Sequence, residues 1–378
     1  MKKNPNTPTL LMVASSERDA DLYYATRFFA PDSLVLIQKG KKKILLTSDL
    51  EKDRAKKEAE VNEVFSTTAL AKIYYEKYGR RPSLGDLIVE FARRQRIRGF
   101  LVPGSFPAKY LETLRKKGIR VRIKPDPFIE SRAVKTPAEV RMIGETLRCV
   151  EGAAREAVEI LRRSVIKKGR LYFQGQVLTS EALRMAIHTF LIRKHCAARR
   201  TIVACGKQGI NPHEEGKGPL LAHQPIVLDI FPRNLTHGYY GDFTRTVVRG
   251  EASPKLKRMY AAVKEAQSIA FRMLRHGVNG RNVHESILKY FESCDFKTGL
   301  RNGRMQGFFH GTGHGLGLDI HERPRLGITN EILKAGHVVT VEPGLYYEDT
   351  GGVRLEDVVL ITRTGCRNLT RFPKVLEV

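Results

Sequence analysis

Apolar residues in the first third of the chain follow two patterns, one with the period of strands and one with the period of helices. Runs of branched aliphatic residues at 9–15 and 33–48 predict strands, and a Gly-Lys turn inside the second run makes it a hairpin. The further elements expected here are helices at 50–61, 83–97 and 108–119 and short strands at 98–103 and 121–127. This alternation predicts a small α/β unit.

A strong helix-start pattern follows this unit. Thr136 and Glu139 have the spacing of a capping box, and Pro137 occupies the first helical position between them. A chain of 378 residues is also long for a single core. We therefore expect an N-terminal α/β domain over residues 1–132 and a second domain over residues 133–378.

In the second domain, the order of predicted elements is helices followed by strands, twice over. The expected elements are a long helix from 136, a helix at 177–195, strands at 200–206, 227–232 and 240–250, helices from 253 and at 281–293, and strands at 337–347 and 351–365. The strands at 227–232 and 240–250 read as an antiparallel hairpin. The repeated order hints at a duplicated α+β unit.

The chain is strongly basic, with a formal net charge of +26. Residues 1–135 hold 29 Lys and Arg against 16 Asp and Glu, which is half of the excess. Such a surface could attract nucleic acid. However, the basic residues alternate with acidic and apolar ones and lack interleaved aromatic residues for base stacking, so a solvated surface is favoured and nucleic-acid binding is the alternative.

The remaining bulk features exclude several classes of protein. No apolar run approaches the ~20 residues of a membrane span, and the first apolar run is short for a signal-peptide core, so we expect a cytoplasmic protein without a membrane segment. The five cysteines are scattered and form no CxxC pair, which predicts neither a disulfide framework nor a thiolate zinc site. Walker-type phosphate loops, HExxH helices and GxSxG elbows do not occur.

Four acidic residues interrupt runs that otherwise read as buried strands. They are Asp229, Asp242, Glu342 and Glu356, each next to β-branched or aromatic residues. Carboxylates are disfavoured inside strands and costly to bury unless they are paired or coordinated. A single such residue is usually an edge residue or an arginine partner, but four of them in two predicted hairpins could converge. Their mutual repulsion then calls for cations between them.

The segment HGTGHGLGLDIHE at 310–322 contains three histidines and four glycines. Glycine-rich backbone is entropically costly to order, so it usually marks a close approach of the main chain. One of these histidines could supply a nitrogen ligand to a carboxylate-rich site. A site of this kind suits Mn²⁺, Co²⁺, Fe²⁺ or Zn²⁺, and bridging carboxylates commonly hold two such ions.

In this order, the two aspartates, HGTGHGLGLDIHERP, VEPGLYY and GVRLED resemble the motifs of the pita-bread metallopeptidases, and within them the Xaa-Pro aminopeptidases and prolidases (Xaa-Pro dipeptidases). The motifs cover roughly residues 200–360. The resemblance implies an α+β fold in which a smaller creatinase-like α/β N-terminal domain precedes a pita-bread (creatinase/aminopeptidase-like) catalytic domain. It also implies two divalent metal ions, of which manganese is expected and cobalt, zinc or iron are alternatives. A homodimer is expected as well.

The resemblance also implies a role for each motif residue. The metal ligands would be Asp229, Asp242, His314, Glu342 and Glu356, with Asp242 and Glu356 bridging the ions. A bridging water would attack as hydroxide, and Glu342 would pass its proton to the leaving proline nitrogen. His310 and His321 would stabilise the scissile carbonyl and its oxyanion.

Two further residues match positions near the substrate in this family. His213, in GINPHEEG, would bind substrate, and Arg354 would support the site and the proline side of the substrate; a surface-loop position and an ion pair with a carboxylate are the respective alternatives. The chain departs from the family pattern at Phe231, where glycine is common. It also departs in the hairpin tip between Asp229 and Asp242, which is longer than the resemblance implies.

These features predict a dinuclear-metal-dependent exopeptidase that hydrolyses Xaa-Pro bonds in peptides with proline at the second position. The sequence leaves open whether the substrate is a dipeptide or a longer peptide. A methionine aminopeptidase or a creatinase of the same fold is a second enzymatic reading, against which GVRLED and LDIHE argue. The alternative from another class is a non-catalytic pita-bread-fold protein that binds nucleic acid or a protein partner through its basic surface.

Overall fold

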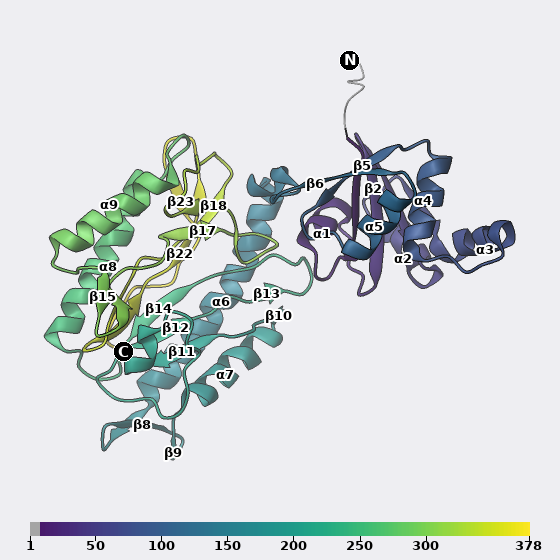
Figure 1. Cartoon of the computed structure of the whole chain (residues 1–378). Coiled ribbons are helices and arrows are strands. Elements are labelled where there is room, and N and C mark those ends of the chain that lie inside the picture. The colour runs from purple at the N-terminus through teal and green to yellow at the C-terminus, as the bar shows by residue number, and fades with distance from the viewer. Residues whose placement is uncertain (1–7) are drawn as a thin grey trace. The chain divides into compact units, whose positions relative to one another are not determined.

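The computed structural model describes residues 8–378, so the first seven residues of the expected N-terminal domain lie outside it. The chain divides into two compact units, with the division between Arg132 and Ala133. Figure 1 shows both units. No helix among residues 8–378 is both long enough and apolar enough to cross a bilayer.

The first unit is a six-stranded mixed sheet in the order β4-β3-β2-β1-β5-β6. Its elements are β1 (Leu10–Ser15), α1 (Ala20–Thr26), β2 (Ser33–Lys39), β3 (Lys42–Thr47), α2 (Asp49–Glu58), β4 (Glu63–Ser66), α3 (Thr67–Tyr78), α4 (Leu84–Arg94), β5 (Gly99–Pro103), α5 (Ala108–Lys116) and β6 (Arg120–Lys124). The predicted hairpin is the antiparallel pair β2–β3, and β1 pairs antiparallel with β2. β4, β5 and β6 add in parallel.

Helices cover both faces of this sheet because successive strand residues point to opposite sides. On β1, Leu11 and Val13 face a cluster that includes Ile88 of α4. Met12 faces the other cluster, with Leu22 of α1. A strand buried on both faces has a continuous apolar sequence, which is why LLMVAS was recognised as a strand.

The second unit is built from four long helices and several small sheets. Its elements are α6 (Pro137–Arg163), β7 (Val165–Lys167), β8 (Arg170–Phe173), β9 (Gln176–Val177), α7 (Ser180–Ile192), β10 (Cys196–Ala197), β11 (Ile202–Cys205), β12 (Ile226–Asp229), β13 (Arg233–Asn234), β14 (Thr244–Val247), α8 (Pro254–Met273), α9 (Gly280–Ser293), β15 (Gly299–Arg301), β16 (Arg304–Gln306), β17 (Gly313–Gly315), β18 (Glu322–Leu326), β19 (Val338–Val341), β20 (Gly344–Tyr347), β21 (Gly351–Arg354), β22 (Asp357–Ile361) and β23 (Cys366–Asn368). The predicted capping box is present at the start of α6.

The helices of the second unit fall into two pairs, each covering its own sheet. α6 and α7 pack with β11, β12 and β14 in one apolar cluster, and α8 and α9 pack with β19 to β22 in another. Figure 1 shows α8 and α9 on one side of the strands and α7 on the other. The sheets meet where the Glu356 N–H donates to the Thr244 carbonyl at 3.0 Å. The repeated order of helices and strands in the sequence therefore corresponds to two similar layers facing one another.

The prediction of two continuous strands at 337–347 and 351–365 is wrong. Each run is broken near its acidic residue, into β19 and β20 at Glu342-Pro343 and into β21 and β22 at Leu355-Glu356. β19 pairs with β22 in a five-stranded sheet, whereas β20 pairs with β21 in a separate hairpin. Pro343 has no N–H to donate to a ladder, and Glu356 is buried at the second break.

Several other elements were not predicted, among them α1, α3, β4 and the small β7–β8–β9 sheet. The helix α3 was missed because Tyr74 is its only buried residue, so its apolar pattern is weak. The strand β4 and the small β7–β8–β9 sheet were missed because their strands have four residues or fewer. All five cysteines are free, as their scattered positions indicated.

Candidate metal centre

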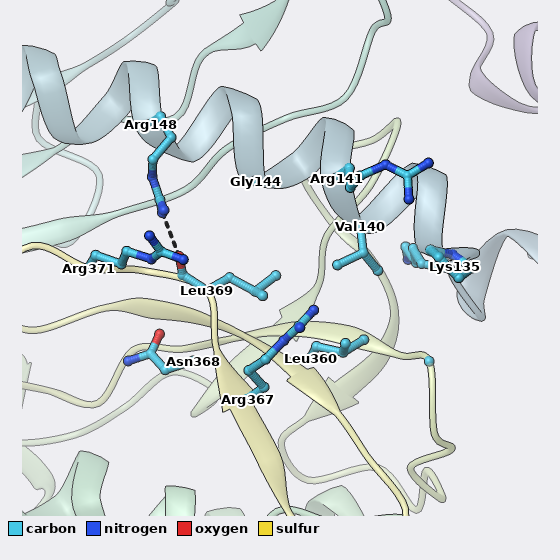
Figure 2. A pocket seen from close by; sticks show the side chains of 12 residues that line it. Lys135, Val140, Arg141, Gly144, Arg148, Leu360, Arg367, Asn368, Leu369 and Arg371 are labelled. Carbon is cyan, nitrogen blue, oxygen red and sulfur yellow. Dashed lines mark hydrogen bonds between the residues drawn. The ribbon is translucent and has the colours of Figure 1, made fainter.

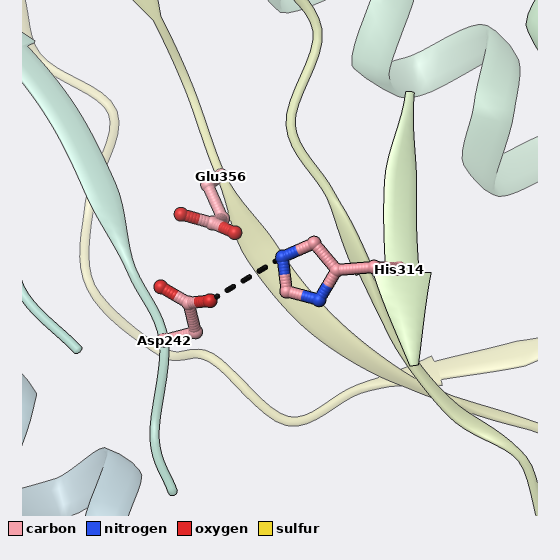
Figure 3. A group of neighbouring side chains, drawn as sticks. All are labelled: Asp242, His314 and Glu356. Carbon is pink, nitrogen blue, oxygen red and sulfur yellow. Dashed lines mark ion pairs between the residues drawn. The ribbon is translucent and has the colours of Figure 1, made fainter. Parts of the chain in front are cut away.

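Three of the predicted ligands come together at the junction of the two layers. One ligand atom each from Asp242, His314 and Glu356 lies within 4.8 Å of the others, and all three residues are buried. Figure 3 shows the three side chains converging from separate segments of the chain. Asp242 lies two residues before β14, His314 is the middle residue of β17, and Glu356 directly precedes β22.

The glycines around His314 allow the backbone to approach its neighbours closely. A Cβ atom on Gly313 would lie 2.0 Å from the Thr340 carbonyl oxygen, and one on Gly315 would lie 2.4 Å from the Arg323 carbonyl oxygen. Both distances are shorter than any ordinary contact, so neither position accepts a side chain. The glycine-rich stretch therefore places the His314 imidazole by bringing β17 into the sheet.

The hydrogen bonds of His314 fix its tautomer. Its Nδ1 lies 3.1 Å from the Gly315 carbonyl, which can only accept, so Nδ1 carries the proton. The lone pair of Nε2 then faces the acids, 3.6 Å from Asp242 Oδ2 and 3.3 Å from Glu342 Oε1. Burial lowers the pKa of His314 to about 3, and the neighbouring His321 adds to this shift. A neutral ring with an exposed lone pair is the form that binds a metal ion.

The carboxylates are held close together at an electrostatic cost. Burial raises the pKa of Asp242 well above its usual value, and Asp229 and Glu342 raise it further. Burial and then Asp242 have the same effect on the pKa of Glu356. Burial also raises the pKa of Glu342 to about 7, although Arg354 opposes this shift. Carboxylates in such a group are stabilised by a cation between them.

Hydroxyl groups from the strands orient two of the acids. Thr244 donates to Glu356 Oε2 at 2.8 Å. Thr340 accepts from the His314 N–H at 3.0 Å and donates to Glu342 Oε1 at 3.3 Å. These threonines were missed in the sequence, although Thr244 lies two residues after Asp242 and Thr340 lies two residues before Glu342.

Asp229 ends β12 and is tied to Arg354. Arg354 Nη2 donates to Asp229 Oδ2 at 2.6 Å, while Oδ1 of the same carboxylate is buried without a hydrogen-bond partner among residues 8–378. Arg354 Nη1 donates to the Tyr346 hydroxyl at 2.9 Å. The ion pair that sequence analysis named as the alternative for Arg354 is therefore present in the structure.

The family model for metallopeptidase family M24 matches residues 145–363, which is more than half of the chain. The chain belongs to metallopeptidase family M24. The uncharacterized peptidase YqhT of Bacillus subtilis is 30% identical over 251 residues, which are 65% of this chain and 64% of that protein. The Xaa-Pro dipeptidase of Pyrococcus furiosus is 27% identical over 347 residues, 90% of this chain and 88% of that protein.

The fold of this M24 chain is also similar to that of solved peptidases. The X-Pro aminopeptidase of Thermotoga maritima superposes with a TM-score of 0.80 at 22% identity, covering 98% of this chain and 97% of that one. The predicted fold class, a smaller α/β domain followed by a pita-bread domain, is confirmed.

The three other histidines of interest lie around the acids of the M24 chain. His310 is half-buried; its Nδ1 donates to the Gly311 carbonyl at 2.8 Å, and its Nε2 lies 2.9 Å from the Tyr346 hydroxyl. His321 is exposed and packs edge-on against His314, with ring centroids 4.3 Å apart. His213 is exposed, and it directly follows Pro212, whose carbonyl accepts from Arg354 Nη2 at 3.3 Å. His310 is therefore linked to the site through Tyr346, His321 lies against His314, and His213 follows a residue bound to Arg354.

Proposed function

We propose that this M24 chain is a dinuclear-metal-dependent exopeptidase that hydrolyses Xaa-Pro bonds. The observation that carries the proposal is the convergence of Asp242, His314 and Glu356 within 4.8 Å, with Glu342 beside His314. The name of the Pyrococcus furiosus relative, Xaa-Pro dipeptidase, and that of the Thermotoga maritima structure, X-Pro aminopeptidase, support the same substrate class. The non-catalytic alternative is not favoured, because every acid of the motif set remains in this chain.

The donor set fits a pair of divalent ions. Four carboxylates and one imidazole nitrogen without a proton suit Mn²⁺, and also Co²⁺, Zn²⁺ or Fe²⁺. The unpartnered Oδ1 of Asp229 is a further available oxygen. Asp229, Asp242, His314, Glu342 and Glu356 are the residues that would hold the ions. When bound, such ions supply Lewis acidity, which lowers the pKa of water and polarises a peptide carbonyl.

Glu342 is the proposed proton carrier of the reaction. Burial raises the pKa of this carboxyl group, to about 7 in the protein alone, and a carboxyl group beside the acidic cluster can take up and release a proton. Thr340 fixes the carboxylate by its hydrogen bond to Oε1. The second oxygen is therefore the one that we assign to moving a proton toward the leaving proline nitrogen.

His321 and His310 are proposed to stabilise the scissile carbonyl and its oxyanion. His321 has no hydrogen bond within the described chain and is exposed, so it is available to donate to a bound peptide. His310 accepts from Tyr346 in the protein alone, because its Nδ1 already holds the ring proton. Its donation to a peptide therefore requires the proton to move to Nε2. His213 is proposed to bind substrate.

Arg354 is proposed to support the site on the proline side of the substrate. It holds Asp229 and the Tyr346 hydroxyl, and Nη2 also reaches the Pro212 carbonyl at 3.3 Å, next to His213. We further propose a cytoplasmic homodimer in which residues 1–132 form a creatinase-like domain and residues 133–378 form the catalytic domain.

The test is a comparison of three peptides. The full chain, freed of metal with a chelator and reloaded with Mn²⁺, is assayed on Ala-Pro, Ala-Pro-Ala and the matched Ala-Ala-Ala. We expect Mn²⁺-dependent cleavage that requires proline at the second position, and the ratio of the first two rates separates a dipeptidase from an aminopeptidase. An Mn²⁺-loaded protein that cleaves neither proline peptide would contradict the proposal.

A further inference from the structure

A cleft of about 520 Å³ lies in the second unit, on the side of α6 where β22 and β23 run beneath it. Four arginines line it: Arg141 and Arg148 from α6, Arg367 from β23, and Arg371 from the segment after β23. We refer to it as the arginine cleft. Figure 2 shows Arg148 reaching across toward Leu369 and Arg367 extending from the strand side toward α6.

The arginine cleft carries positive charge that the protein does not neutralise. Arg148 is paired with Glu151 at 2.9 Å, and its guanidinium also donates to the Leu369 carbonyl. In contrast, Arg141, Arg367 and Arg371 have no ion pair within residues 8–378, and all three side chains are exposed. Like charges gathered in one concavity repel one another, so an anion that enters the cleft relieves this repulsion.

No acidic residue lines the arginine cleft. Its remaining cation, Lys135, is paired with Glu322 at 2.8 Å and is almost completely buried. The floor of the cleft is apolar, because the Val140 and Leu360 side chains face the gap. The two glycines of the lining, Gly144 and Gly336, leave part of the wall without side chains.

The unpaired guanidinium groups and the apolar floor together indicate which class of ligand fits the cleft. Guanidinium groups bind phosphate oxygens in a bidentate manner, and three uncompensated charges match a group that carries several phosphates. The cleft volume lies in the range of small-molecule sites. Its lining contains no aromatic residue, which argues against a single-stranded nucleic acid bound by base stacking.

We propose that the arginine cleft binds a small molecule with two or more phosphate groups, such as a nucleoside diphosphate. The phosphates lie around Arg367, which extends into the gap, with Arg371 toward one end of the cleft and Arg141 toward the other, and the carbon part of the ligand rests on Val140 and Leu360. The site is separate from the acidic cluster, and its occupancy does not depend on the proposed peptidase activity.

The experiment titrates the full, metal-loaded chain with ADP, inorganic tripolyphosphate and adenosine by isothermal calorimetry at physiological salt. We expect one ADP and one tripolyphosphate per chain, and no binding of adenosine. Arg367→Glu and Arg141→Glu lie on opposite walls and should each weaken ADP binding at least about tenfold, because each removes a charge-assisted contact. Both side chains are exposed, and thermal unfolding checks that each variant is folded.

Two controls separate this site from other sources of binding. Arg363→Glu changes an exposed arginine in the turn before β23 that does not line the cleft, and it should alter ADP affinity less than about twofold. His314→Ala, which weakens the metal centre, should leave ADP binding unchanged. Equal weakening by Arg363→Glu, loss of binding in His314→Ala, or no saturable binding in the unaltered chain would each overturn the proposal.

Discussion

Gln267 of α8 connects the two strands that carry acids of the metal centre. Its side chain is fully buried, and Nε2 donates to the Val341 carbonyl at 2.8 Å and to the Leu355 carbonyl at 3.2 Å. These carbonyls belong to the residues directly before Glu342 and Glu356. Gln267 therefore fixes the spacing of the two acids although it touches neither of them.

Replacing Gln267 with leucine removes both hydrogen bonds while nearly keeping the side-chain volume. Each buried carbonyl that loses its partner costs about 1–3 kcal/mol. The Oε1 atom of Gln267 has no hydrogen-bond partner within residues 8–378. Leucine removes this buried unpaired acceptor, and the stability gained in this way offsets the cost of one of the two carbonyls. The net loss in the free energy of unfolding is then about 1–3 kcal/mol. Because support groups behind metal ligands matter for binding, Mn²⁺ affinity should fall by about 10–100-fold.

The assay is urea unfolding of the metal-free chain together with calorimetric titration of Mn²⁺. Ser268→Ala is the matched control, because its hydroxyl donates only to the Lys264 carbonyl of the same helix. The positioning role would be refuted if Gln267→Leu bound Mn²⁺ as tightly as the unaltered chain and the Ser268→Ala control. Loss of stability without loss of affinity would reduce Gln267 to a purely structural residue.

Three further predictions concern single residues. His314→Ala should abolish Mn²⁺-dependent thermal stabilisation, which calorimetric scans with and without Mn²⁺ would detect, and an unchanged upshift would contradict its role as ligand. Arg354→Lys should lower kcat for Ala-Pro by about tenfold or more, because one ammonium group cannot hold Asp229 and Tyr346 together, and wild-type kcat would contradict this. Burial lowers the pKa of His337 to about 4, with Lys135 adding to the shift. The neutral ring therefore contributes stability above pH 6.5 that is lost as the pH falls toward 4, about 3 kcal/mol in all. In His337→Gln, the free energy of unfolding in urea should therefore fall by about 3 kcal/mol less between pH 6.5 and 4 than in the unaltered chain. An equally steep pH dependence in both proteins would contradict the assignment.

Much of the site could be predicted because its residues contradict the pattern around them. Carboxylates such as Asp229 and Glu356 stand out in runs of valine, isoleucine and leucine, and glycines around His314 stand out in a segment that must be ordered. These features follow from the cost of burying charge and of ordering glycine, which act at the level of single residues.

The residues that support the site could not be found in this way. Thr244 and Thr340 are ordinary strand residues by propensity, and their hydroxyl partners become evident only when the strands are placed. Gln267 reads as one more polar residue of a helix, because its partners lie 74 and 88 residues further along the chain. The strand breaks at Pro343 and Glu356 depend on the meeting of two sheets, which is a tertiary feature.

The central claim is that five side chains from both layers hold a pair of divalent ions. The most direct measurement is an anomalous-scattering map from crystals of the full chain grown with Mn²⁺. The account predicts two manganese peaks among Asp229, Asp242, His314, Glu342 and Glu356, with Asp242 and Glu356 touching both. A map in which these side chains surround no manganese would contradict it.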